Sequence, residues 1–88
     1  MKEIATMLRE NSTMQLFVVG HTDNVGGIGS NMTLSKARAE SVVRELTTKH
    51  GVNATRLAAH GVGSLSPVAS NATENGRALN RRVELVPQ

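Results

Sequence analysis

The 88-residue chain contains no cysteine, tryptophan or tyrosine, and it has a single phenylalanine. The absence of cysteine excludes disulfide bonds, thiol catalysis and cysteine-ligated metal sites. With almost no aromatic rings, the core must be built from Leu, Val, Ile, Ala and Met. No stretch approaches the ~20 apolar residues of a membrane-spanning helix, so we expect no insertion into a membrane by this segment. The first residues form no apolar run typical of an export signal, which we therefore expect to lie outside this sequence.

The remaining composition is that of one small globular domain, which we place over residues 1–88. Apolar residues make up 39% and charged residues 19%, with a net charge of +3. This mild excess suits an anionic polymer or an anionic membrane surface. Because no aromatic stacking residues accompany the basic side chains of Arg77, Arg81 and Arg82, we expect no nucleic-acid binding.

Hydropathy patterning predicts alternating helices and strands, which indicates an α/β layer structure. Residues 14–20 form an apolar run typical of a strand covered on both faces. Residues 34–50 follow a helical period that places Ala39, Val42, Val43 and Leu46 on one buried face. The other expected elements are helices over 2–9 and 73–80, one helical turn over 54–56, strands over 57–62 and 82–86, and a loop over 21–32.

The loop over residues 21–32 and the helix expected after it carry the most informative residues. Asp23 and Asn31 flank a glycine-rich turn, and Lys36 and Arg38 fall in the first two turns expected for the helix. A helix start normally favours acidic residues, so two cations there breach a local preference, and such breaches often mark function. Exposed N–H groups beside a guanidinium suit a carboxylate or a phosphate.

Asp23 at the end of a strand and Arg38 on the helix would form a pair of opposite charges. The two side chains could bind each other as a plain salt bridge between loop and helix. They could instead bind a ligand that carries an ammonium and a carboxylate. Their spacing leaves both interpretations open.

Two blocks of sequence resemble the OmpA-like peptidoglycan-binding family. The first runs over residues 20–42 and reads GHTDNVGGIGSNMTLSKARAESV. The second follows in order, with Gly-Val at 51–52, Arg-Leu at 56–57, Gly-x-Gly at 61–63, Pro67, Asn-x-Thr at 71–73 and GRALNRRVE at 76–84. The resemblance covers roughly residue 16 to the end.

This resemblance implies a non-catalytic domain that binds the meso-diaminopimelate of the peptidoglycan stem peptide. It would anchor an outer-membrane or envelope protein to the wall from the periplasm, without cofactor or metal. A wall anchor of a motor stator or secretion machine is the alternative within the family. Asp23 would take the ligand ammonium and Arg38 the carboxylate, assisted by N–H groups at the helix start, and Asn31 would orient the loop or bond the ligand. The resemblance further implies pocket-lining roles for Thr22 and Leu34 and supporting roles for Asn80 and Arg81.

The family fold implied is β-α-β-α-β-β, with helices packed on a mixed sheet and the last strand antiparallel between the first two. Residues 2–9 resemble the first helix of that fold, so we expect the first strand to be missing from this chain. Its absence would leave residues 82–86 as an exposed edge, and exposed edges recruit partners. We therefore expect a homodimer through the final strand, or marginal stability as a monomer.

The sequence contains no pattern typical of a catalytic site. The sequence contains no Gly-x-Ser-x-Gly elbow, and no nucleophile, base and oxyanion site can be assembled. The glycine loop lacks the Lys-Ser/Thr of a phosphate loop, and His21 stands far in sequence from His50 and His60, as a structural histidine would. We therefore expect no enzyme. A peptidoglycan-modifying enzyme is one alternative, and a structural oligomerisation domain in which Asp23 and Arg38 only bridge each other is another.

Overall fold

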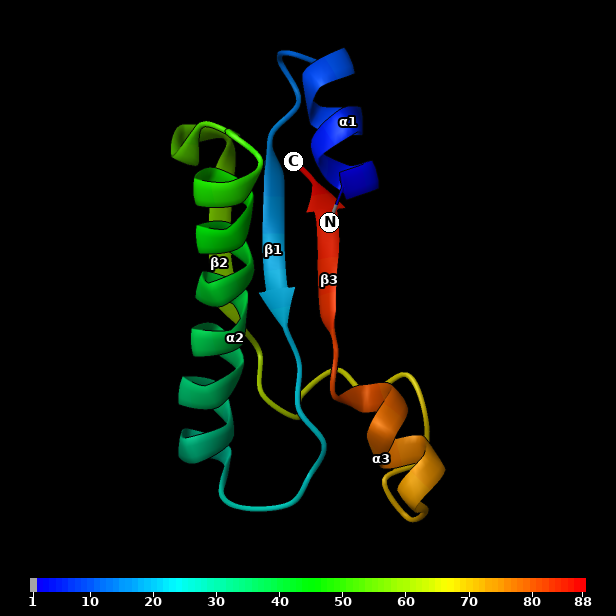
Figure 1. Ribbon diagram of the computed structural model, residues 1–88. Helices are drawn as coiled ribbons and strands as arrows, with labels where there is room; N and C mark the ends of the chain where they lie inside the picture. The colour runs from blue at the N-terminus through cyan, green and yellow to red at the C-terminus, as the bar shows by residue number, and fades with distance from the viewer. Residues whose placement is uncertain (1) are drawn as a thin grey trace.

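A computed structural model describes residues 2–88 of the chain, which fold around a three-stranded mixed sheet (Figure 1). The apolar strand β1 (Leu16–Gly20) lies at its centre. On one side it pairs in parallel with β2 (Leu57–Gly61), and on the other it pairs antiparallel with β3 (Val83–Pro87). The expected mixed sheet with an antiparallel last strand is confirmed.

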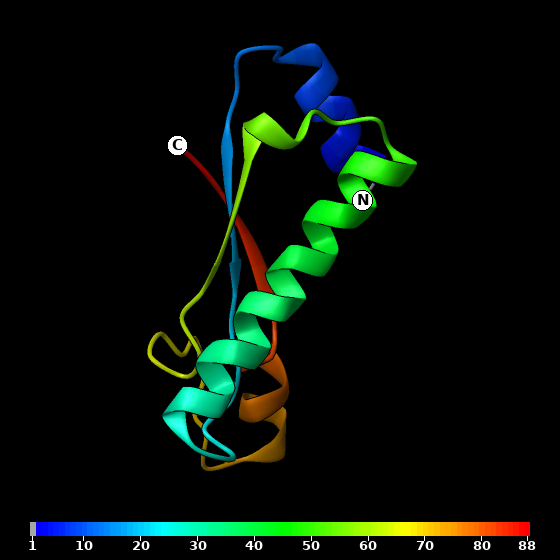
Figure 2. The same cartoon turned by 90° about the vertical axis from the view of Figure 1, so that its left-hand side faces the viewer.

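The helices α1 (Lys2–Glu10) and α2 (Ile28–Lys49) lie on the same side of the sheet (Figure 2). At one end α2 lies close to the sheet, and it diverges toward its C-terminal end, where α1 fills the space between them (Figure 2). The core forms along this wedge, because apolar side chains from all layers meet there. Its fully or largely buried members are Ala5, Leu8, Leu16, Val18, Ala39, Leu46, Val52 and Leu57.

The opposite face of the sheet is open, which corrects the prediction that β1 is covered on both faces. Phe17 is 37% exposed and Val86 is 40% exposed. The Phe17 ring contacts the imidazole of His60 edge-to-face, with centroids 5.5 Å apart. A continuous apolar run suits a doubly covered strand, but the two large helices both pack on the other side, so this face keeps its apolar side chains partly in solvent.

The start of α2 also differs from the prediction. The helix begins at Ile28, after Gly27 as its N-cap and Gly26 at a positive φ of 92°. The glycine and polar content of this region indicated a loop, but one glycine completes the turn and the helix follows at once. Arg38 is therefore ten residues into α2, about 15 Å along its axis from the first turn. The predicted basic helix start, and its N–H groups assisting Arg38, are wrong.

Two glycines of the sheet set where α2 crosses it. A Cβ atom at Gly20 would lie 1.9 Å from the backbone oxygen of Ser35, and one at Gly61 would lie 2.3 Å from the Lys36 nitrogen. Only glycine permits this approach. The crossing fixes the position of α2 relative to the loop that follows β1.

The short elements fall close to where they were expected. A 3-10 turn η1 (Ala54–Arg56) is capped by Asn53, whose side chain accepts a hydrogen bond from the Thr55 N–H. Helix α3 (Glu74–Asn80) starts after Thr73, whose hydroxyl accepts from the Gly76 N–H. Both caps use side chains that prefer helix N-termini.

Strand β3 pairs only with β1 among residues 2–88, so its outer edge is open, as expected. Pairing of that edge with a second copy stays a prediction. Within the same residues, no helix is both long and apolar enough to cross a membrane.

Candidate ligand-binding site

The carboxylate of Asp23 lies in the loop after β1, where it is held by two hydrogen bonds. Its Oδ1 accepts from the Val25 N–H at 3.0 Å, and its Oδ2 accepts from Arg81 Nη1 at 2.7 Å. The bond from Val25, followed by the bond from Arg81, holds the pKa of Asp23 below its ordinary value. Asp23 is 8% exposed, so the carboxylate is largely buried. Its lowered pKa favours the ionised form despite this burial.

The salt-bridge partner of Asp23 is Arg81, which corrects the interpretation that Asp23 and Arg38 bridge each other. Arg81 follows α3 directly and reaches back to the loop after β1. Its second terminal nitrogen, Nη2, donates to Glu74 Oε1 at 2.8 Å. Arg81 therefore joins two carboxylates from two parts of the chain, and its own pKa is raised, first by Glu74 and then by Asp23.

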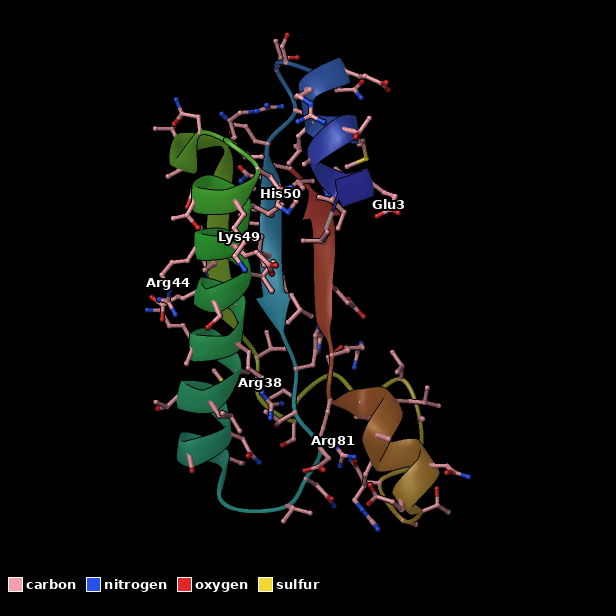
Figure 3. All side chains as sticks on the ribbon, in the orientation of Figure 1. Glu3, Arg38, Arg44, Lys49, His50 and Arg81 are labelled. Atoms are coloured by element: carbon pink, nitrogen blue, oxygen red, sulfur yellow. The ribbon has the colours of Figure 1, made fainter. Side chains whose placement is uncertain are left out.

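Arg38 has no hydrogen bond or ion pair among the residues that the structure describes. It points from α2 toward the end of the molecule where Arg81 lies (Figure 3). Both side chains line one shallow cavity of about 490 Å³. The other lining residues are Ser41, Val42, Arg82 and Val83.

All three nitrogens of the third guanidinium of the cavity, Arg82, donate hydrogen bonds within the protein. Its Nε donates to Glu84 Oε1 at 2.7 Å, its Nη1 to the Asn80 carbonyl at 3.3 Å and its Nη2 to the Ser66 carbonyl at 3.0 Å. Since Arg81 is also shared between two carboxylates, Arg38 is the guanidinium of this cavity that is left for an external anion. A carboxylate is the natural partner, because the guanidinium fork matches its two oxygens.

Asn31 and Thr22 hold the backbone around Asp23. Asn31 Nδ2 donates to the Asp23 carbonyl at 3.3 Å, and Thr22 Oγ1 donates to the same carbonyl at 2.9 Å. Both residues are buried, at 5% and 4% exposure. Of the two roles expected for Asn31, orientation of the loop has a visible contact, and the bond to a ligand stays a prediction. Neither side chain lines the cavity described above.

Asn80 is completely buried beneath the loop between β2 and α3. Its Oδ1 accepts from the N–H groups of Val68 and Ala69, and its Nδ2 donates to the Ala69 carbonyl and to Asn71 Oδ1. These four bonds match its donor and acceptor groups, so it fixes that loop. Leu34, by contrast, is 44% exposed on α2 and lies outside the lining of the cavity.

Sequence reasoning missed four residues that line the cavity, Ser41, Val42, Arg82 and Val83, and it also missed Glu74, which binds Arg81. Ser41 and Val42 stand three and four positions after Arg38, so helical spacing alone would have placed them beside it. Arg82 and Glu74 approach the site only through folding of the chain around α3. Arg82 directly follows the predicted Arg81 in sequence, whereas no local pattern points to Glu74.

Within residues 2–88, no group of three or more His, Asp and Glu side chains could hold a metal ion. His21 is 3% exposed, and burial is the main cause of its lowered pKa, which favours the neutral form of the ring.

Fold and site together define a small α/β module with an unpaired guanidinium in a shallow cavity and an ionised, largely buried carboxylate joined to the cavity wall through Arg81. The model of the OmpA family matches residues 1–81. The chain belongs to this family.

Individual relatives agree with the family assignment. The probable lipoprotein YiaD of Escherichia coli K12 is 45% identical over 82 residues, which are 93% of this chain and 37% of that protein. The peptidoglycan-binding protein ArfA of Mycobacterium tuberculosis H37Rv is 41% identical over 86 residues, 98% of this chain and 26% of ArfA. The crystal structure of the peptidoglycan-associated lipoprotein from Burkholderia pseudomallei matches with a TM-score of 0.92 at 33% identity, covering 99% of this chain and 73% of that one.

The chain therefore spans about a quarter to two fifths of the length of such curated relatives.

Proposed function

We propose that this domain binds peptidoglycan without cleaving it and anchors an envelope protein to the cell wall on the periplasmic side. The observation that carries the proposal is the unpaired Arg38 guanidinium in the cavity. The names of the relatives support the same class of ligand, since one is a peptidoglycan-binding protein and another is a peptidoglycan-associated lipoprotein.

The ligand group that fits is the side-chain end of meso-diaminopimelate, where one carbon carries an ammonium and a carboxylate. Arg38 would bind the carboxylate in a two-pronged, charge-assisted pair. Asp23 would accept the ammonium, because an ionised carboxylate has about four lone-pair positions and two are used within the protein. Both groups of the ligand would then be matched by opposite charges.

The other site residues fall into two groups in this proposal. Asn31, Thr22 and Asn80 fix the loops that hold Asp23 and Arg81 in place. Leu34, exposed on α2, would offer an apolar contact to the stem peptide. Since two ion pairs must offset the hydration of a small zwitterion, the affinity is expected to be modest.

The direct test is cosedimentation of the domain with purified, diaminopimelate-containing peptidoglycan sacculi. Arg38→Ala removes the unpaired cation, so we expect at least a tenfold loss of bound protein with the circular dichroism spectrum unchanged. Lys49→Ala is the matched control, because Lys49 is an exposed cation at the other end of the same helix (Figure 3). Equal capture of Arg38→Ala and the unchanged domain would contradict the proposed site.

A further inference from the structure

The carboxylate of Asp23 is not free to receive a ligand ammonium without competition. Arg81 already donates to it at 2.7 Å, but the same guanidinium donates at 2.8 Å to Glu74. Arg81 is 37% exposed, whereas the Asp23 side chain is 11% exposed. Any cation that approaches Asp23 must therefore share it with a guanidinium whose other end is held by Glu74.

Glu74 is itself held in place by the chemistry of α3. It occupies the first turn, where an acidic side chain interacts favourably with the exposed N–H groups of the helix. Its Oε2 accepts from Arg77 Nε at 3.1 Å, one turn along the helix, and Arg77 is fixed in turn by a bond to the Asn71 carbonyl at 3.0 Å. Glu74 can therefore keep its other oxygen, Oε1, on Arg81.

The charges in this group balance. Asp23 and Glu74 supply two negative charges, and Arg77 and Arg81 supply two positive charges. Loss of the Glu74 charge would leave the group with one excess positive charge. It would also leave Asp23 as the only carboxylate bound to Arg81. Both changes disfavour an ammonium at Asp23, and neither disfavours a carboxylate at Arg38.

We propose that Glu74 is a positioning residue: by sharing the Arg81 guanidinium with Asp23, it leaves Asp23 able to accept a ligand ammonium and so makes the site selective for a zwitterion over a plain carboxylate. This inference rests on the function proposed above. It assigns the selectivity to α3, which touches neither end of the ligand in that proposal. The loop after β1 supplies the carboxylate, and α3 determines how available it is.

The test compares two synthetic tripeptides by isothermal titration calorimetry on the whole 88-residue chain. One is L-Ala-γ-D-Glu-meso-diaminopimelate, and the other carries 2-aminopimelate, which lacks only the side-chain ammonium. For Glu74→Gln we expect the affinity for the first peptide to fall about two- to fivefold, the range of an exposed ion pair. The affinity for the second peptide stays the same or rises. Glu74→Asp, which keeps the charge, restores most of the preference for the first peptide.

Glu10→Gln is the matched control, since Glu10 is an exposed carboxylate at the end of α1, away from the site, and its loss changes the net charge equally. It should change neither affinity. An equal change for both peptides in Glu74→Gln, or no change in either, overturns the role of Glu74 while the binding function stands. If the unchanged domain binds neither peptide, the proposed function fails, and this inference fails with it.

Discussion

Asp23 is a largely buried carboxylate whose charged form is stabilised by the protein. Two donors, the Val25 N–H and Arg81, stabilise its charged form although the side chain is largely buried. An unpaired carboxylate in the same place would take up a proton or lose its position. Arg38 is the opposite case, because nothing among the described residues neutralises it. In the proposed site, the protein therefore stabilises the negative charge of Asp23, and a ligand carboxylate would neutralise the positive charge of Arg38.

The lowered pKa of Asp23 predicts how stability depends on pH. A carboxyl whose pKa is lower in the folded state contributes stability above its unfolded pKa, about 4, and that contribution is lost as pH falls through the folded value. The unchanged domain should therefore lose stability to urea between pH 5 and the acid range. In Asp23→Asn, the part of this loss due to Asp23 should be absent. Glu74 and Glu84, whose pKa values are also lowered, keep their own contributions in both proteins. Identical pH profiles for the two proteins would show that Asp23 does not titrate as described.

Among the elements, the crossing of β1 and α2 matters most, because it places Arg38 relative to the loop that carries Asp23. The Cβ of an alanine at Gly20 would collide with the Ser35 backbone oxygen, 1.9 Å away. Backbone atoms in a packed helix cannot move aside without disturbing the core.

Gly20→Ala should therefore lower the free energy of unfolding by about 3 kcal/mol or more. The control is Gly29→Ala in the first turn of α2, where a Cβ would meet nothing within 4 Å. Because alanine favours a helix over glycine, this variant should be unchanged or more stable by up to about 1 kcal/mol. Urea unfolding monitored by circular dichroism measures both. A Gly20→Ala protein as stable as the control would contradict the close crossing.

Local patterns in the sequence predict most of the elements. The buried face of α2 contains Ala39 and Leu46 as its helical period indicates, and the Asn53 cap forms at its predicted turn. The start of α2 was predicted too late in the sequence, because glycines at 26, 27 and 29 are typical of a loop. In the structure only Gly26 of these three has a positive φ, and the helix begins at Ile28.

The ion pair between Asp23 and Arg81 was not predicted, for a different reason. Arg81 is 58 residues from Asp23 in sequence, and only the folded chain brings them together. Local residues indicated Asp23, Asn31 and Arg38, and the resemblance to a family added the other predicted site residues. The partners of these residues had to come from the structure. The same holds for Arg56, which donates to the carbonyls of Leu8, Asn11 and Met14 without any local signal.

At the scale of the whole molecule, the site occupies one end of an elongated domain with extents of 41 × 22 × 22 Å. The loops that follow β1 and β2 gather there with α3, while α1 and the end of β3 lie at the opposite end (Figure 1). Ligands of α/β folds commonly bind beyond the carboxyl ends of parallel strands, which is where this cavity lies. A wall polymer bound at that end would leave the other end of the domain clear.

The most direct test of peptidoglycan binding at this site is an NMR titration of the ¹⁵N-labelled domain with two stem tripeptides. One carries meso-diaminopimelate, and the other carries lysine, which keeps the side-chain ammonium and lacks the carboxylate that Arg38 would bind. We predict chemical shift changes centred on Asp23, Asn31 and Arg38 with the diaminopimelate peptide and far weaker changes with the lysine peptide. Equal changes with both peptides, changes centred on the open sheet face around Phe17, or no change with either would contradict the account.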